Sequence, residues 1–247
     1  MDKITEMEFM NSLFAKTIQK PLYGYQRKLI GNPSPKVIIN KSRQIGISTL
    51  YACYGLVKSC IFGKTVLIVS PSERQSKHVM DYIRNFIIPL KAHFGDLGFQ
   101  EETKTSIIFK NGGQIVSLPN SPDTVRGFKA DLIILDEFAH FLNGTDKEMI
   151  NAILPSISRG GKITIISTPF GENGLFYEYW TKEKGFEKFV INWKDCPDLK
   201  IEEIRESMDE ISFSQEYENI FIGELDSYFP FDLIKSCVNE ELECVSL

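Results

Sequence analysis

Short apolar runs alternate with longer amphipathic stretches along this chain. Several runs have the length and β-branched composition of strands that are buried on both faces. They span residues 37–39, 65–69, 132–135, 163–166 and 189–193. The stretches at 1–20, 25–30, 73–90, 146–157 and 175–180 have the pattern of helices. Because strands and helices alternate, the pattern predicts an α/β fold with a central, mostly parallel sheet flanked by helices.

Two segments depart from this alternation. Residues 106–109 and 114–118 are joined by Asn111-Gly112-Gly113, which predicts a β-hairpin inserted before the run at 132–135. From Pro197 onward the pattern changes to two helices, at about 201–208 and 213–222. We therefore expect a core over residues 1–195 and a smaller subdomain over residues 196–247.

A loop that is typical of phosphate binding lies between the first strand and the helix after it. Its sequence, KSRQIGIST, spans Lys41 to Thr49. Aligned on G-x-x-x-x-G-K-[ST], Gly46 takes the last glycine and Ser48 the magnesium-binding hydroxyl, and the amides of residues 42–48 face the phosphates. Ile47 stands where the lysine is expected, and isoleucine cannot neutralise a phosphate. Either the loop is inert, or another cation, Lys41 or Arg43, replaces the lysine.

Polar residues end two of the other predicted strands. The run at 132–135 ends in Asp136-Glu137, and the run at 163–166 ends in Ser167-Thr168-Pro169. In a nucleotide enzyme, Asp136 would hold Mg²⁺ and Glu137 would polarise the attacking water. Each motif alone is also typical of an ordinary turn or a solvated strand end. Their order and spacing together favour a nucleotide site.

Taken together, these motifs resemble the ATPase domain of the large terminase subunit, the DNA-packaging motor of tailed bacteriophages. The resemblance extends from about Leu22 to about Phe229. It is carried by Tyr25-Gln26, which resembles the adenine-contacting glutamine motif, by KSRQIGIST, by DTVRGFKADLIILDEFAHF and by ISTPFGENGLFYEYW. It implies a P-loop NTPase of the ASCE type that uses ATP and Mg²⁺, with the segment from Pro197 onward as a helical lid.

The resemblance also assigns roles to individual residues. Glu137 would be catalytic, with Lys41 as the first choice for the substituting cation and Arg43 as the second. Ser48 and Asp136 would hold the metal. Arg126 would act as an arginine finger toward a neighbouring subunit. The nucleotide would contact Tyr25, Gln26, Lys41, Ser42, Arg43, Gln44, Ile45, Gly46, Ile47, Ser48 and Thr49, and the coupling motif would comprise Ser167, Thr168 and Pro169.

The partners implied by the resemblance are double-stranded DNA, a portal protein and a small terminase subunit. The active form would be a homo-oligomeric ring in the cytoplasm of the bacterial host, and the isolated chain a monomer with feeble turnover. Residues 224–231 would lie near the join to a nuclease domain. The residues after them leave no room for an acidic triad, so cleavage would fall to a separate polypeptide or a removed C-terminal portion.

Composition agrees with an intracellular ATPase. With 247 residues of which 43% are hydrophobic, the chain can bury one large core, and no run approaches a membrane span. Five scattered cysteines without a C-x-x-C pair argue against a zinc site or a disulfide scaffold. The net charge of −5 is unevenly distributed: residues 200–247 carry 13 acidic and 3 basic side chains, a net of −10, which leaves +5 on residues 1–199. The core can therefore still present a basic surface to DNA.

Two other functions remain open from the sequence. A DExx-type helicase also combines a glutamine motif, a phosphate loop and a DE box, but it should carry a second motor domain. The absent lysine at Ile47 is compatible with a catalytically silent nucleotide-binding module.

Overall fold

The computed structural model describes residues 3–94, 98–141 and 144–223, so the predicted join at 224–231 lies outside the described residues. In the described part, eight strands form one sheet in the order β3-β4-β5-β2-β6-β7-β1-β8. The strands β5-β2-β6-β7-β1-β8 run parallel to one another, whereas β4 is antiparallel to β5 and to β3. The strands are β1 (Lys36–Lys41), β2 (Thr65–Ser70), β3 (Phe99–Glu102), β4 (Ser106–Phe109), β5 (Gln114–Pro119), β6 (Leu132–Asp136), β7 (Lys162–Ser167) and β8 (Glu187–Ile191).

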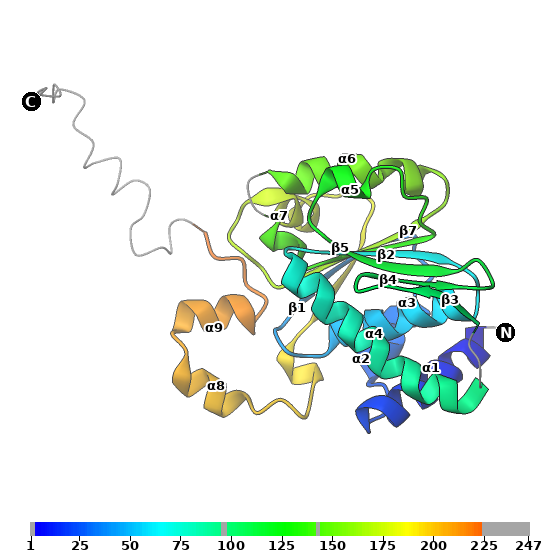
Figure 1. Ribbon diagram of the computed structural model, residues 1–247. Helices are drawn as coiled ribbons and strands as arrows, with labels where there is room; N and C mark the ends of the chain where they lie inside the picture. Colours follow the sequence, from blue (N-terminus) through cyan, green and yellow to red (C-terminus); the bar gives the residue numbers. More distant parts are fainter. Residues whose placement is uncertain (1–2, 95–97, 142–143, 224–247) are drawn as a thin grey trace, which may run out of the picture.

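Helices cover both faces of the sheet. α1 to α4 pack on one face and α5 to α7 on the other, whereas α8 and α9 lie beyond the carboxyl ends of the parallel strands (Figure 1). The helices are α1 (Lys3–Ile18), α2 (Gly24–Gly31), α3 (Ile47–Cys60), α4 (Glu73–Phe94), α5 (Pro122–Val125), α6 (Thr145–Ser158), α7 (Gly174–Thr181), α8 (Ile201–Ser207) and α9 (Glu210–Glu216), with the 3₁₀ turns η1 (Phe138–His140) and η2 (Trp193–Asp195). None of the described helices is long and apolar enough to cross a membrane.

The apolar runs are continuous because the parallel strands are buried on both faces. Alternate side chains of a strand point to opposite faces of the sheet. On β1, Val37 and Ile39 belong to the hydrophobic cluster under α1 to α4, whereas Ile38 belongs to the cluster under α5 to α7. α3 can pack closely on this sheet at Gly55, where a Cβ atom would lie 3.0 Å from Ile115 and 3.1 Å from Val66. The core therefore holds the helix that follows the phosphate loop against the sheet.

The strand order brings the predicted site together. β7 lies between β1 and β6, and the parallel register pairs Asn40 with Ser167 and Asp136 with Ile166. The ends of these three strands therefore meet at one edge of the sheet, which we call the carboxyl edge. This confirms the mostly parallel α/β fold that the sequence predicts.

Three predicted elements differ from the structure. The hairpin of β4 and β5 is continuous with the main sheet, because β5 pairs with β2 over its whole length, and β3 extends it. The last strand ends at Ile191 rather than at Trp193. The second lid helix ends at Glu216 rather than at residue 222, because the chain turns there and Asn219 adopts the left-handed φ of 65°.

Candidate nucleotide site

The loop between β1 and α3 surrounds the N-terminus of α3. Gly46 directly precedes the helix with φ of 76°, a left-handed conformation that glycine adopts without steric cost. The amides of Ser42 and Arg43 already donate to carbonyls at the end of β8 and of α9, at 2.9 and 2.8 Å. The amides of residues 44–48 remain at the helix N-terminus, where backbone N–H groups lack intrahelical partners. This narrows the predicted cradle of residues 42–48 to an anion site over residues 44–48.

Lys41 reaches the carboxylate that follows β6. Its Nζ lies 2.7 Å from Oε1 of Glu137, and only 6% of the Lys41 side chain is exposed. The other oxygen of Glu137, Oε2, is buried and has no hydrogen-bond partner among the described residues. Glu137 adopts φ of 54°, a left-handed backbone that costs a non-glycine residue about 1 kcal/mol. Pairing with Lys41 thus engages one carboxylate oxygen of Glu137 and leaves the other, buried beside it, without a partner among the described residues.

A hydroxyl and a second carboxylate meet beside this pair. Ser48 Oγ donates to Asp136 Oδ1 at 3.0 Å, and Asp136 is buried. With Lys41 positive and both carboxylates ionised, the state in which they could hold a cation, the cluster carries a net charge of −1. Carboxylate and hydroxyl oxygens are ligands that Mg²⁺ accepts, and the excess negative charge fits a cation. Ser48 and Asp136 therefore form a donor set suited to Mg²⁺.

The two carboxyl groups titrate in opposite directions. Burial, together with the charge of Glu137, raises the pKa of Asp136. Burial alone would also raise the pKa of Glu137, but the charge and the hydrogen bond of Lys41 outweigh it and lower that pKa. Glu137 is therefore ionised at neutral pH, whereas Asp136 retains its proton more readily until a cation replaces it.

The missing lysine has a structural explanation. Ile47 is 1% exposed and belongs to the hydrophobic cluster under α1 to α4. Arg43, the other cation of the loop, directs its side chain outward: it is 56% exposed, and its nearest carboxylate is Glu216 at 3.8 Å. Lys41 is therefore the loop cation that faces Glu137 and Asp136.

Because the Ile47 side chain is packed in the core, we expect Ile47→Lys to destabilise the protein rather than complete the loop. Burying an ammonium group there should lower the free energy of unfolding by about 3 kcal/mol. Urea unfolding of Ile47→Lys beside the nearly isosteric Ile47→Leu measures this effect. An Ile47→Lys variant as stable as Ile47→Leu, with raised turnover, would show that the position faces the phosphates instead.

A cavity of about 230 Å³ adjoins the loop on the side of α1. Gln26, Gln44, Gly46 and Thr49 line it, and Tyr23 lines it where Tyr25 was expected. Gln26 is buried, and its Oε1 accepts from the amide of Tyr23 at 3.0 Å. Tyr25 supports the loop instead, donating from its hydroxyl to the Ile45 carbonyl at 2.6 Å. The predicted glutamine motif therefore lies against the loop and beside a cavity of a size suited to a base.

The segment after β7 contacts the turn that carries Glu137. Ser167 Oγ accepts from the amide of Ala139 at 3.1 Å. Thr168 Oγ1 lies 3.4 Å from Nε2 of His140, whose ring is 4.6 Å from that of Phe170. Burial lowers the pKa of His140, so this imidazole is neutral at pH 7. His140 was not among the site residues expected from the sequence, although its position three residues after the Asp136-Glu137 pair was a usable signal.

A buried polar network ties the loop to the segment after α9. Asn219 Nδ2 donates to Asn40 Oδ1 at 3.1 Å, and Asn40 Nδ2 donates to the Asn219 carbonyl at 2.9 Å. Ser42 Oγ donates to the Tyr217 carbonyl and accepts from the Trp193 amide. No sequence signal marked Asn40 or Asn219, because isolated asparagines have no motif.

α9 also contacts the segment after β7. Gln215 Oε1 accepts from the amide of Gly171 at 3.3 Å. α8 and α9 have a small hydrophobic cluster of their own, formed by Ile201, Phe213 and Tyr217. The α8–α9 pair therefore contacts both the phosphate loop and the segment after β7.

Arg126 lies away from these contacts. Its side chain is 61% exposed and pairs with Asp123 at 3.0 Å within the turn that contains α5. An exposed guanidinium is free to leave such a pair, because surface ion pairs are worth only about 0.5 kcal/mol. Arg126 is therefore available to another molecule.

Three comparisons identify the relatives of this chain. A sequence profile described as "Terminase large subunit, T4likevirus-type, N-terminal" matches residues 38–236. The chain is 23% identical over 261 residues to the "Probable terminase, ATPase subunit" of Haemophilus phage HP1 (strain HP1c1), covering 87% of this chain and 40% of that protein. The chain thus spans less than half the length of this relative.

Solved structures share the fold. The large terminase ATPase domain of Thermus phage P74-26 matches with a TM-score of 0.69 and 21% identity, covering 85% of this chain and 97% of that one. The large terminase of the thermophilic bacteriophage D6E, solved in complex with ADP, matches with a TM-score of 0.59 and 19% identity, covering 82% of this chain and 54% of that one. Since the profile covers most of the residues and the motifs meet at one edge of the sheet, the chain belongs to the family of terminase large subunits of the T4likevirus type, within its N-terminal region.

Proposed function

We propose that this chain is the ATP-hydrolysing motor domain of a large terminase subunit and that it powers translocation of double-stranded viral DNA into a procapsid. The observation that carries the proposal is the contact of Lys41 with Glu137 beside the Ser48–Asp136 pair. This contact supplies the cation that the phosphate loop otherwise lacks. The HP1 relative is described as an ATPase subunit, and the D6E large terminase was solved with ADP, which supports nucleotide chemistry.

In the proposed reaction, the amides of residues 44–48 and the ammonium of Lys41 bind the phosphates of ATP. Glu137, through its unpaired Oε2, orients a water molecule and accepts its hydrogen bond. The water oxygen attacks the γ-phosphorus and gives a proton to Oε2 of Glu137, and the bond to the β–γ bridging oxygen breaks. ADP and phosphate leave, and the proton on Glu137 returns to solvent. Bound by Ser48 and Asp136, Mg²⁺ would neutralise charge on the phosphates.

The adenine would occupy the cavity beside Gln26. The side-chain amide of Gln26 lies next to Gly46 of the phosphate loop. The same loop would therefore contact both the base and the phosphates. A buried amide at this position offers both donor and acceptor atoms to an adenine edge. This division of roles assigns the base to α2 and the phosphates to the start of α3.

We further propose that residues 1–195 form the motor core and residues 196–247 a lid. Loss of the γ-phosphate would shift Thr168, which lies 3.4 Å from His140 in the turn that follows Glu137. The shift would reach α9 through Gly171 and Gln215. The network of Ser42 and Asn219 gives the phosphate loop a second connection to the same lid.

The proposed partners follow from this function. A ring of copies in the cytoplasm of the host would engage a portal protein, a small terminase subunit and a nuclease, whether that nuclease is a further domain or a separate chain.

A catalytically silent module is the rival reading, and Ile47 favours it. The pairing of Lys41 with Glu137 argues against that reading, because a silent module has no need of a strained Glu137.

Hydrolysis of Mg-ATP by the wild type and by Glu137→Gln tests the proposal. We expect Glu137→Gln to lower turnover about a hundredfold while nucleotide binding persists, because the amide keeps the shape of the side chain but cannot accept a proton. Equal, negligible turnover in both proteins would favour the silent module. Strand separation by the wild type would instead favour the helicase.

Arg126 should act across subunits. We expect Arg126→Ala to lower turnover of the assembled ring about a thousandfold. Mixing it with Glu137→Gln subunits should restore part of the activity, because each Glu137→Gln neighbour still contributes its arginine. Asp123→Ala, which removes only the carboxylate paired with Arg126, is the matched control and should retain activity. Failure of the mixture to exceed the sum of its components would count against an arginine acting in trans.

A further inference from the structure

A basic groove runs along the amino edge of the sheet, opposite to the edge that holds the nucleotide site. Three adjoining cavities of about 90, 230 and 180 Å³ form it. The first two share Tyr54, Lys58 and Lys162, and the last two share Asp131 and Gly160. We call these three cavities the amino-edge groove.

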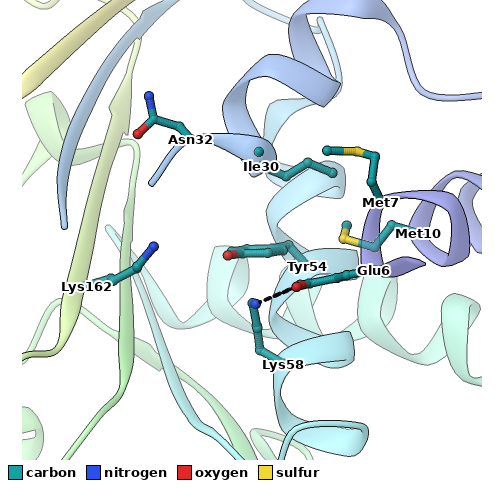
Figure 2. Close-up of a pocket in the computed structure, with 9 residues that line it drawn as sticks. Glu6, Met7, Met10, Ile30, Asn32, Tyr54, Lys58 and Lys162 are labelled. Carbon is teal, nitrogen blue, oxygen red and sulfur yellow. Dashed lines mark hydrogen bonds and ion pairs between the residues drawn. The ribbon is translucent and has the colours of Figure 1, made fainter. Parts of the chain in front are cut away.

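The groove crosses the beginnings of four neighbouring strands. Asn32 and Lys64 lie ahead of β1 and β2, Asp131 directly precedes β6, and Lys162 begins β7. These strands are adjacent in the sheet in the order β2-β6-β7-β1. At about 4.8 Å between strands, the groove extends across about 14 Å. Figure 2 shows its first cavity, with Lys162 from β7 on one side and Tyr54 and Lys58 from α3 together on the other.

Positive charge dominates the lining. The basic side chains are Lys58, Lys64, Lys129, Arg159 and Lys162, against the two carboxylates Glu6 and Asp131. Both carboxylates are already paired, Glu6 with Lys58 at 2.7 Å and Asp131 with Lys64 at 3.1 Å. The lining thus carries a net charge of +3, although the whole chain carries −5.

Two of these cations are unpaired. Within the described ranges, the side chains of Lys129 and Arg159 form no hydrogen bond or ion pair, and both are exposed. Lys58 and Arg159 lie at the C-terminal ends of α3 and α6, where the helix dipole favours basic residues, so the dipole explains their presence. It does not explain Lys64, Lys129 and Lys162, which lie at the starts of strands or in loops. The groove therefore has the charge of a site for a polyanion.

We propose that the amino-edge groove binds the sugar-phosphate backbone of duplex DNA. Along one strand of a duplex, a phosphate recurs about every 3.4 Å of helix axis, so a groove of about 14 Å faces about four phosphates. Lysine ammonium groups contact phosphates as point charges without reading bases, which suits a motor that moves along any sequence. The inference rests on the proposed function, because DNA is the polyanion that such a motor moves.

The position of the groove gives the proposal a mechanical consequence. β6 has Asp131 of the groove directly before it and ends at Asp136 of the nucleotide site. β7 likewise begins at Lys162 and ends at Ser167. DNA and ATP would therefore bind at opposite edges of one sheet, joined by the same two buried strands.

Fluorescence anisotropy with a labelled, mixed-sequence duplex of about 30 base pairs tests this, over salt from about 50 to about 200 mM. The test variant is Lys129→Gln/Arg159→Gln. Lys77→Gln/Lys200→Gln is the control, because it removes the same charge from exposed side chains outside the groove. We expect the test variant to raise the Kd about tenfold at the lowest salt and to reduce the log–log salt slope by about two. The control should leave both within about twofold of wild type.

Equal Kd values for the test variant and wild type would overturn the proposal, as would wild-type protein that fails to bind the duplex at the lowest salt. Polyglutamate that displaces the duplex at equal charge concentration, with the same dependence on Lys129 and Arg159, would identify an acidic protein as the partner instead. Basal Mg-ATP turnover without DNA is measured on the same preparations. If the wild type shows no turnover, the proposed function alone is refuted. If turnover is normal but Lys129→Gln/Arg159→Gln binds DNA as tightly as the wild type, the groove alone is refuted.

Discussion

Lys41→Ala should lower Mg-ATP turnover about a thousandfold, whereas Arg43→Ala should lower it less than about tenfold. The two residues are the only cations of the phosphate loop, but they face different surroundings. Lys41 is buried against Glu137, and Arg43 extends into solvent beside Glu216. A buried charge acts on the phosphates without solvent screening, so Lys41 should stabilise the transition state far more strongly than Arg43.

Loss of folding has to be separated from loss of catalysis in this comparison. Lys41→Ala leaves the partly buried Glu137 and the buried Asp136 without their shared ammonium group, which should lower the free energy of unfolding by about 3 kcal/mol. The double variant Lys41→Met/Glu137→Gln restores charge balance, so it should regain that stability and remain inactive. Urea unfolding gives the stability of each variant. Steady-state turnover is then measured under conditions in which every variant is folded, so that a loss of turnover reports on catalysis. A larger loss for Arg43→Ala, or turnover that survives neutralisation of both cations, would contradict the assignment.

The fold was predictable because buried parallel strands have an unmistakable composition. Leu132–Leu135 and Ile163–Ile166 contact hydrophobic side chains on both faces, so these runs carry no polar residue except Thr164. The candidate site was predictable for a related reason. Parallel strands end at a common edge, so polar residues that follow such runs are brought together whatever their separation in sequence.

Other features depend on contacts that a single sequence does not display. The helix over 213–222 ends early because Asn219 takes a left-handed conformation and bonds to Asn40. The assignment of the loop cation depends on the direction of two side chains, which spacing does not specify. The amino-edge groove combines Lys64, Lys129 and Lys162 from three separate segments of the chain, so no local run of charge marks it.

Asp136→Asn should abolish most activity and yet stabilise the protein in the absence of metal. Loss of a magnesium ligand should lower turnover about a thousandfold. The same change removes one of two adjacent carboxylates that share a single buried ammonium group, and Ser48 can still donate to the amide oxygen. Ser48→Ala is the matched control: it should also lower turnover, but it leaves Asp136 without its hydrogen bond and should lower stability.

The pH dependence of this stabilisation follows from the pKa of Asp136, which burial and the charge of Glu137 raise to about 7. A folded-state pKa above the unfolded value near 3.9 means that the folded protein binds the proton more tightly. The stability contributed by the protonated carboxyl is thus fully present below pH about 4 and is lost as the pH rises to about 7. In urea unfolding with a chelator, Asp136→Asn should therefore gain roughly 4 kcal/mol relative to wild type between these limits. Added Mg²⁺ should stabilise the wild type alone, and a difference between the two proteins that does not change with pH would show that Asp136 is ionised without metal.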